Sequence, residues 1–111
     1  MHETGTYVCI EGPRFSTKAE SKMYRMWGAD VVGMTLVPEC VLAREAELCY
    51  ASIATVTDYD VWKDHPVCVD DIVKTMSANI ESVKRIIAET VTKMPKDSGC
   101  ACKEALKGAF A

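Results

Sequence analysis

The amino-acid sequence predicts an α/β fold in which helices cover a largely parallel sheet. Three short runs rich in apolar and β-branched residues, at positions 6–10, 31–35 and 49–56, have the length and composition of strands. Two segments of helical period lie between these runs, and a longer helical pattern follows the last one. Strands that alternate with helices are joined by crossovers, which place successive strands parallel in one sheet.

The first strand is expected to stop at the Gly12-Pro13 breaker. Thr17 and Glu20 have the spacing of a capping box, so a helix is predicted from there to about Trp27. Gly28 stands where a C-cap glycine belongs. The residues of this helix expected to face the core are Ala19, Met23, Met26 and Trp27.

The second strand is followed by a helix that begins near Pro38, a residue suited to the first helical turn. Its expected buried face comprises Val41, Leu42, Ala46 and Leu48. The last helix is predicted to begin at the cap residues Asp70 or Asp71 and to run to about Met94. Its apolar positions recur every three or four residues, which predicts that it packs on the sheet.

Two carboxylates follow the third predicted strand, at Asp58 and Asp60. A strand period of two places them on the same face. Ligands of open α/β sheets bind just beyond the carboxyl ends of the strands, where such a pair can accept from an amine, donate when protonated or bind a metal. The alternative interpretation is that either residue only forms a turn or a helix cap.

Length and charge exclude several classes of protein. A chain of 111 residues forms one domain at most, and a net charge of -3 without a basic run argues against nucleic-acid binding. No apolar run reaches membrane-spanning length and the start is polar, so a soluble, cytoplasmic protein is expected. The sequence contains no glycine-rich phosphate loop, Ser/His/Asp set or metal cluster, and His65 is expected to be a solvated loop residue.

Six cysteines are unusual for a chain of this length. Four of them lie in or beside apolar segments, where thiols usually act as small core residues. Cys100 and Cys102 instead follow the flexible segment 95–99, where two thiols can meet each other, a metal or a partner cysteine. We expect a redox or disulfide role, and the alternative is that the two thiols are a chance pair. Two ligands do not make a zinc site, which needs four groups or three plus water. Disulfides in a cytoplasmic protein indicate a hyperthermophilic source.

Three ordered motifs resemble the methylthioadenosine phosphorylases of the trimeric purine nucleoside phosphorylase family. They are Glu11-Gly12-Pro13-Arg14-Phe15-Ser16-Thr17, Gly28-Ala29-Asp30-Val31-Val32-Gly33-Met34-Thr35-Leu36-Val37-Pro38-Glu39 and Thr57-Asp58-Tyr59-Asp60. The resemblance covers nearly the whole chain and matches the C-terminal part of the family's α/β/α fold, a central mixed sheet flanked by helices. The Cys-Ala-Cys tail is similar to that of archaeal members.

The resemblance implies phosphorolysis of 5′-methylthioadenosine to adenine and 5-methylthioribose 1-phosphate. Phosphate is a co-substrate in this reaction, and neither a metal nor another cofactor is implied. By resemblance Phe15 packs against base and ribose, Ser16 lies at the base edge, Met34 lies under the sugar and Thr35 helps to hold phosphate. Gly33 and Thr57 complete the implied substrate-binding set on this side of the base.

Asp58 is implied to face N7 and the 6-amino group of adenine, with Asp60 beside it. A carboxyl group that shares a proton with N7 neutralises the departing purine. Relatives that prefer 6-oxopurines carry asparagine at the position of Asp58, so aspartate favours adenine. Val69 and Ile72 match positions that line the 5′-methylthio pocket; read from the sequence alone they are core residues at a helix start.

Two departures from the family pattern limit the inference. Gly33 stands where the mammalian enzyme has asparagine, which weakens the restriction to adenine. Family members are more than twice as long, and their N-terminal part carries most of the phosphate site. Residues 1–95 are therefore expected to form the C-terminal portion of a phosphorylase domain and 96–111 a Cys-x-Cys tail. Exposed apolar surface, and a homotrimer or homohexamer for the complete family member, are also expected.

Three alternatives stay open at this point. The first is a purine nucleoside phosphorylase of broader specificity. The second is a catalytically inactive binding or assembly module that associates through an exposed sheet edge and the C-terminal cysteines. The third is a thiol oxidoreductase, although Cys100 and Cys102 lack the usual Cys-x-x-Cys spacing.

Overall fold

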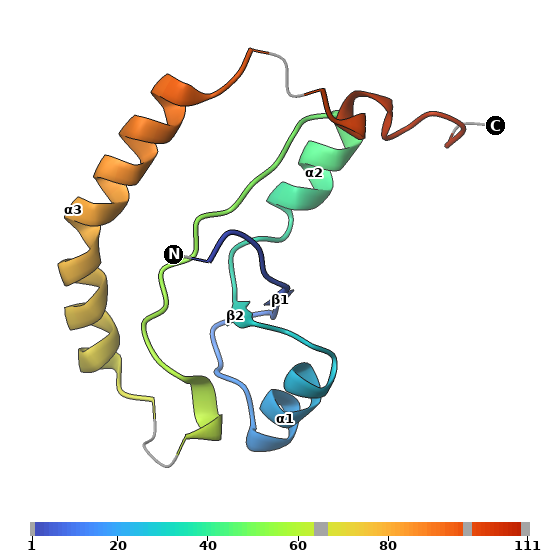
Figure 1. The fold of residues 1–111 in the computed structure, drawn as a ribbon. Helices are drawn as coiled ribbons and strands as arrows, with labels where there is room; N and C mark the ends of the chain where they lie inside the picture. Colours follow the sequence, from blue (N-terminus) through green and yellow to red (C-terminus); the bar gives the residue numbers. More distant parts are fainter. Residues whose placement is uncertain (1, 64–66, 97–98, 110–111) are drawn as a thin grey trace.

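The computed structural model describes residues 2–63, 67–96 and 99–109 of the chain. Its elements are β1 (Tyr7–Cys9), α1 (Lys18–Met26), β2 (Val31–Gly33), α2 (Glu39–Glu45), the short 3-10 helix η1 (Asp60–Trp62), α3 (Val69–Lys93) and the 3-10 helix η2 (Ala101–Glu104). Figure 1 shows α1 joining the two strands and α3 standing at the edge of the molecule. The predicted α/β class is confirmed.

The strands β1 and β2 pair in parallel, with α1 as their crossover. Tyr7 lies opposite Val31, and Cys9 lies opposite Gly33. The backbone N–H of Ile10 donates to the Gly33 carbonyl at 2.8 Å and so extends the pairing past the carboxyl end of both strands. The loops that follow the strands therefore leave the sheet at the same edge, which is where α/β proteins bind ligands.

Both predicted ends of α1 are confirmed. Thr17 is the N-cap of a complete capping box with Glu20. At the other end Gly28 has a φ of +79°, a left-handed conformation that glycine adopts without steric cost. The N–H of Gly28 donates to the Arg25 carbonyl at 3.1 Å and that of Ala29 to the Tyr24 carbonyl at 3.0 Å, which is the Schellman pattern.

The predicted third strand at 49–56 is wrong. This segment runs extended between α2 and η1 (Figure 1), but it pairs with neither β1 nor β2 and its side chains are exposed. A strand exists only when a neighbouring strand supplies partners for its N–H and C=O groups, and the described sheet has two strands. The segment therefore has the composition of a strand, but the described sheet offers it no strand to pair with.

The expected packing of the helices is also corrected. Of the α1 residues predicted to face inward, Ala19, Met26 and Trp27 are exposed and only Met23 is half-buried. The helix α2 ends at Glu45, before the predicted Leu48, and Val41, Leu42, Ala46 and Leu48 are exposed as well. The described chain offers these faces no second layer, and the pairs of elements that pack extensively are β1 with β2 and α1 with η1.

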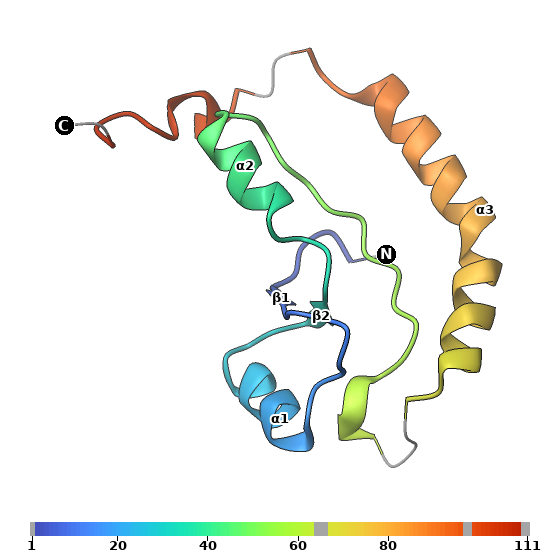
Figure 2. The ribbon, with the colours of Figure 1, turned by 180° about the vertical axis from the view of Figure 1, so that it is seen from behind.

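The long helix α3 begins at Val69, with Cys68 as its N-cap. Asp70 and Asp71 therefore lie within the first turn, where the helix dipole stabilises their negative charges. The prediction that one of them is the N-cap is wrong. The prediction that α3 packs on the sheet is wrong, because this helix makes no extensive contact with another element in residues 2–63, 67–96 or 99–109. Figure 2 shows it well apart from β1 and β2.

Among the described residues no apolar side chain is buried. The accessible surface is 9308 Å², whereas a compact monomer of this mass exposes about 6,100 Å². The radius of gyration is 16.7 Å, compared with about 13 Å for a compact domain of this length. The expectation of extensive exposed apolar surface is confirmed.

The residues that expose this apolar surface lie in or beside α1, α2 and α3 and in segment 49–56. They include Met26, Trp27, Val41, Leu42, Leu48, Ile53, Val56, Val73, Met76, Ile80, Ile87 and Val91. The four cysteines expected in a core divide into Cys9 and Cys40, which are half-buried, and Cys49 and Cys68, which are exposed. His65 and residues 97–98 of the predicted flexible segment lie outside the described residues. None of the described helices combines the length and the apolarity needed to cross a bilayer.

Replacement of Thr17 by alanine tests the capping box. The side chain accepts from the Glu20 N–H at 3.2 Å, and loss of such a cap costs about 1 kcal/mol. We expect the Glu20 amide of Thr17→Ala to exchange with solvent about fivefold faster, since 1.4 kcal/mol corresponds to about tenfold. Thr92→Ala is the matched control, because that hydroxyl bonds within α3. Unchanged exchange at Glu20 contradicts the assignment.

Candidate active site

The Asp58 carboxylate is half-buried and held by two donors. The Thr57 hydroxyl donates to Oδ2 at 2.8 Å, and the backbone N–H of Asp60 donates to Oδ1 at 2.7 Å. The second bond closes an Asx turn, so Asp58 has the turn role that the sequence left open. Each carboxylate oxygen has a further lone pair, which leaves the group able to accept another hydrogen bond in its fixed orientation.

Asp60 begins η1 with a φ of +54°, a left-handed conformation in which aspartate is enriched among non-glycine residues. The chain therefore turns between Asp58 and Asp60. The predicted geometry, two carboxylates on one face of a strand, is wrong because the segment ends in this turn. Asp60 is nevertheless beside Asp58 and orients its carboxylate through the backbone N–H.

The contact between η1 and α1 brings the Asp58 turn to the rest of the candidate site. The guanidinium of Arg25 lies 4.6 Å from the centre of the Trp62 ring, a cation–π distance. Tyr59 packs edge-on against Trp62, and the Lys63 ammonium lies 3.5 Å from the Tyr59 ring centre. Figures 1 and 2 show η1 alongside α1 from both sides. Segment 57–62 is thereby held next to the helix that follows Phe15 and Ser16.

Phe15 and Ser16 lie in the turn before α1 and differ sharply in exposure. Phe15 is 45% exposed, whereas Ser16 is only 6% exposed. The Ser16 hydroxyl is buried and makes no hydrogen bond to the described residues. An unsatisfied buried hydroxyl costs free energy, so it marks a position where a polar group of a ligand would gain a partner.

Arg14 and Glu20 clamp the turn that carries Phe15 and Ser16. The two Arg14 terminal nitrogens donate to the two Glu20 oxygens at 2.9 and 2.6 Å. The backbone N–H and hydroxyl of Thr17 also donate to Glu20, at 2.8 and 2.9 Å. The Arg14 hydrogen bond, and then the two from Thr17, lower the pKa of Glu20 to about 2, and Glu20 raises the pKa of Arg14. This pair was not predicted from the sequence, because Arg14 precedes the helix and so falls outside the helical spacings at which ion pairs are expected.

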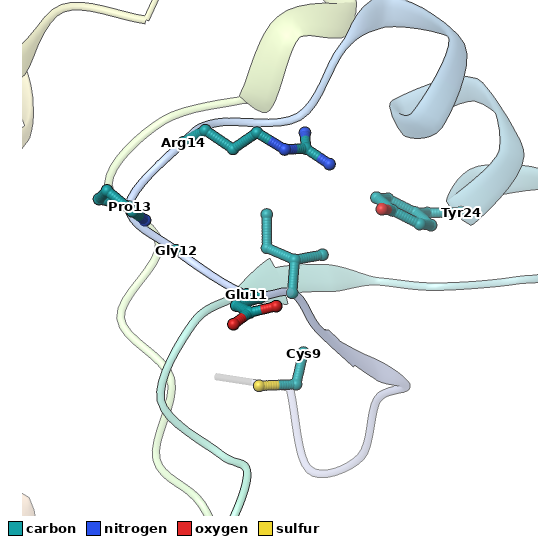
Figure 3. Close-up of a pocket in the computed structure, with 7 residues that line it drawn as sticks. Cys9, Glu11, Gly12, Pro13, Arg14 and Tyr24 are labelled. Atoms are coloured by element: carbon teal, nitrogen blue, oxygen red, sulfur yellow. The ribbon is translucent and has the colours of Figure 1, made fainter.

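An open hollow lies beside this clamp (Figure 3). Its volume is about 590 Å³, and it is lined by Cys9, Ile10, Glu11, Gly12, Pro13, Arg14 and Tyr24. Arg14 reaches from the loop after β1 toward Tyr24 of α1. None of the predicted substrate residues lines the hollow. Its lining residue Arg14 directly precedes Phe15 in the sequence. The hollow is therefore a surface depression next to the candidate site and not the enclosed site itself.

Two glycines let the loops at the strand ends approach each other. A Cβ at Gly12 would lie 2.7 Å from the Met34 Sδ, so a side chain at this position would push the flexible Met34 side chain away from the 11–14 loop. A Cβ at Gly33 would collide with the Tyr7 hydroxyl. Tyr7 thus occupies the space beside Gly33 that a larger side chain at this position would need. The contact follows from the parallel register, in which Tyr7 lies opposite Val31, two residues before Gly33.

The remaining predicted residues are less closely assembled. Thr35 is exposed directly after β2, at the same sheet edge as Met34. Val69, which is 61% exposed, and the half-buried Ile72 lie in the first turn of α3. Since α3 has no extensive contact with another described element, the structure does not bring these two residues against the Asp58 turn. Their role in substrate binding stays a prediction.

The C-terminal cysteines lie beside a third cysteine that the sequence did not single out. None of the six cysteines, all within the described residues, is in a disulfide, so the expected redox or disulfide role of Cys100 and Cys102 stays a prediction. The sulfurs of Cys49 and Cys100 are 3.1 Å apart. Hydrogen bonds with Cys100 and then Cys49 raise the pKa of Cys102 to about 11.

Residues 1–92 match the phosphorylase superfamily, and the chain belongs to that family. Its relatives include the S-methyl-5'-thioadenosine phosphorylase of Nitrosopumilus maritimus, 62% identical over 98% of this chain and 41% of the relative. The enzyme of the same name from Pyrococcus horikoshii is 53% identical over 99% of this chain and 42% of the relative. The chain thus spans about two fifths of the length of these curated relatives. The predicted resemblance, including its archaeal members, is confirmed.

Solved structures lead to the same family. A mutant adenosine/methylthioadenosine phosphorylase of Schistosoma mansoni in complex with adenine superimposes with a TM-score of 0.81 and 45% identity, over 96% of this chain and 38% of that one. Another mutant of that protein, in complex with methylthioadenosine, has a TM-score of 0.77 and 46% identity, over 94% of this chain and 36% of that one. The elements of this chain therefore have the arrangement they take within a phosphorylase fold.

The Tyr7–Gly33 contact is tested by a double-mutant cycle. In Gly33→Ala the new Cβ meets the Tyr7 hydroxyl, and overpacking of this kind costs about 1 to 3 kcal/mol. We expect weaker protection from hydrogen exchange at the Ile10 amide, which bonds the Gly33 carbonyl. Adding Tyr7→Ala removes the clash and restores most of the protection. Additive effects of the two substitutions contradict the contact.

The Arg14–Glu20 clamp predicts a defined response to acid. Because the pKa of Glu20 is lower in the folded state than its ordinary value of 4.5, its stabilisation is complete above pH 4.5 and is lost as the pH falls toward 2. We expect Arg14→Met to raise the pKa of Glu20, measured by NMR titration of its side-chain carboxyl. Lys84→Met, which breaks an exposed pair in α3, is the matched control and leaves Glu20 unchanged. Equal Glu20 titrations in the wild type and Arg14→Met refute the clamp.

Proposed function

We propose that this chain forms the purine-binding side of a site for phosphorolysis of 5′-methylthioadenosine. In this reaction phosphate attacks the anomeric carbon of the ribose, the glycosidic bond breaks, and the products are adenine and 5-methylthioribose 1-phosphate. The observation that carries the proposal is the Asp58 carboxylate, which two donors orient within a turn next to α1. The identities of relatives named for this activity support it.

The proposed role of Asp58 follows from where charge develops. The departing purine gathers negative charge on its ring nitrogens, so a protonated carboxyl that donates to N7 stabilises the transition state more than the ground state. The other oxygen accepts from the 6-amino group. Asp60 acts as a positioning residue, because its N–H holds Oδ1, and Thr57 does the same for Oδ2. These bonds reduce the reorganisation needed when the purine leaves.

The segments at the sheet edge are proposed to hold the rest of the nucleoside. Phe15 offers an exposed aromatic face for base and ribose, and the buried Ser16 hydroxyl offers a partner at the base edge. Met34, seated against Gly12, is proposed to lie under the sugar, with the Gly33 backbone beside it. Val69 and Ile72 are proposed to enclose the 5′-methylthio group once α3 is packed. An apolar wall there favours a thioether over a hydroxyl, which it would leave unpaired.

Phosphate is the proposed co-substrate, without a metal or another cofactor. Thr35 is the residue of this chain proposed to contact it, since it is an exposed residue that follows β2. A phosphate dianion must be held in position for attack, which requires positively charged side chains or several N–H donors around it. We propose that these ligands come from polypeptide corresponding to the part of the relatives that this chain does not match.

The exposed apolar faces support a proposal about assembly. The surface of 9308 Å² exceeds the compact value of about 6,100 Å² by more than a typical protein interface buries. We propose that α2, α3 and segment 49–56 pack against the remainder of a phosphorylase domain, and that the complete enzyme is a cytoplasmic homotrimer or homohexamer. The same observation favours the assembly module as a second candidate for the isolated chain.

A chimera tests the proposed function directly. Residues 1–109 replace the matching segment of the Nitrosopumilus maritimus relative, which supplies the rest of the domain. We expect phosphate-dependent release of adenine from 5′-methylthioadenosine, with inosine as the poor substrate. Asp58→Asn lowers this activity by about 10²- to 10⁴-fold, the usual contribution of a general acid, and raises the relative rate with inosine. Asp70→Asn, an exposed carboxylate of α3, is the matched control.

Each outcome of the chimera experiment separates the candidates. An active chimera that loses activity with Asp58→Asn supports the adenine-specific site. Equal rates with inosine and methylthioadenosine favour the purine nucleoside phosphorylase of broader specificity. A folded, oligomeric but inactive chimera contradicts the proposed site and favours the assembly module.

A further inference from the structure

Three cysteine sulfurs from two distant segments meet beside α2. Cys49 follows α2, whereas Cys100 and Cys102 belong to the start of η2. The three Sγ atoms all lie within 4.8 Å of one another, and those of Cys49 and Cys100 are 3.1 Å apart. The sequence offered only two neighbouring thiols, which are too few for a zinc site. The fold supplies the third.

We propose that Cys49, Cys100 and Cys102 form a binding site for Zn²⁺, with a water as the fourth ligand. Zinc–sulfur bonds of about 2.3 Å in a tetrahedral site place the sulfurs about 3.8 Å apart. The observed spacing is close to this, and the Cys49–Cys100 pair needs to open by less than 1 Å. Cys49 and Cys100 are exposed, which leaves room for the ion and its water.

Binding involves no oxidation or reduction. Three S–H bonds break, three protons pass to solvent and three zinc–sulfur bonds form, so that two positive charges on the ion meet three thiolate charges. Thiolates are soft ligands, and sulfur-rich tetrahedral sites select Zn²⁺ over hard cations such as Mg²⁺ and Ca²⁺. The chemical class of the ligand is therefore a thiophilic divalent cation.

The segment that carries two of the ligands is already docked at α2. The backbone N–H of Leu106 donates to the Glu47 Oε1 at 3.1 Å, so η2 is anchored next to Cys49 without the ion. The N–H of Ala105 donates to the Cys102 carbonyl at 3.1 Å, which keeps the tail in a helical turn. A site assembled in this way loses less conformational entropy on binding. The ion would cross-link Cys49 to the C-terminal tail and so close a loop that contains residues 50–99.

The test is a titration of the reduced protein with Co²⁺ as a spectroscopic probe, followed by displacement with Zn²⁺. We expect one equivalent of Co²⁺ to produce thiolate charge-transfer absorption that Zn²⁺ abolishes. Cys49→Ser, Cys100→Ser and Cys102→Ser each lose a direct ligand and weaken binding by at least about 100-fold, since even indirect partners are worth about 10- to 100-fold. Cys68→Ser, at another exposed cysteine, is the matched control and binds as the wild type does.

Cys102→His separates metal binding from disulfide chemistry. Histidine is a zinc ligand but cannot form a disulfide, so this variant retains stoichiometric binding. Far-UV circular dichroism of every variant confirms that helix content is unchanged. The proposal is overturned if the reduced wild type binds no stoichiometric ion, if Cys68→Ser weakens binding as much as Cys49→Ser does, or if Cys102→His binds no better than Cys102→Ser.

Discussion

The parallel pairing of β1 with β2 is the interaction on which the candidate site depends. Because α1 is the crossover between them, both strands end at the same sheet edge, and the loops that follow carry Gly12 to Ser16 and Met34 to Thr35. The pairing continues through the Ile10–Gly33 hydrogen bond, which fixes the distance between these loops. Tyr7 over Gly33 and Met34 against Gly12 show how little space separates them. The packing of η1 on α1 holds the Asp58 turn near this edge.

The same structure shows why these elements do not make a self-sufficient domain. Hydrophobic burial is the main favourable contribution to folding, and no apolar residue of the described chain is buried. Local interactions instead define the elements: the capping box and Schellman motif of α1, the Arg14–Glu20 clamp and the Asx turn at Asp58. Because the turns of the candidate site rest on local hydrogen bonds, they are well defined without a hydrophobic core. Within the described residues, the helix α3, which carries Val69 and Ile72, has no such local tie and is not packed against these turns.

Features specified by neighbouring residues could be predicted from the sequence, and those that require a partner could not. Thr17, Glu20 and Gly28 determine the ends of α1 through local hydrogen bonds, so the prediction of that helix was accurate. Segment 49–56 has the composition of a strand, but strand formation depends on a neighbouring strand that the described sheet lacks. The sequence likewise predicted the family, which is confirmed, and a site at Asp58, which stays a prediction. The Tyr7–Gly33 contact and the approach of Cys49 to Cys100 arise from tertiary structure.

The central claim is that Asp58 recognises the purine from a turn that this chain orients. A crystal structure of the chimera with adenine and phosphate measures this most directly. The account predicts that the two Asp58 oxygens lie about 3 Å from N7 and from the 6-amino nitrogen, with the Thr57 and Asp60 bonds intact. Adenine bound elsewhere, or with the Asp58 carboxylate beyond hydrogen-bond distance of both nitrogens, would contradict it.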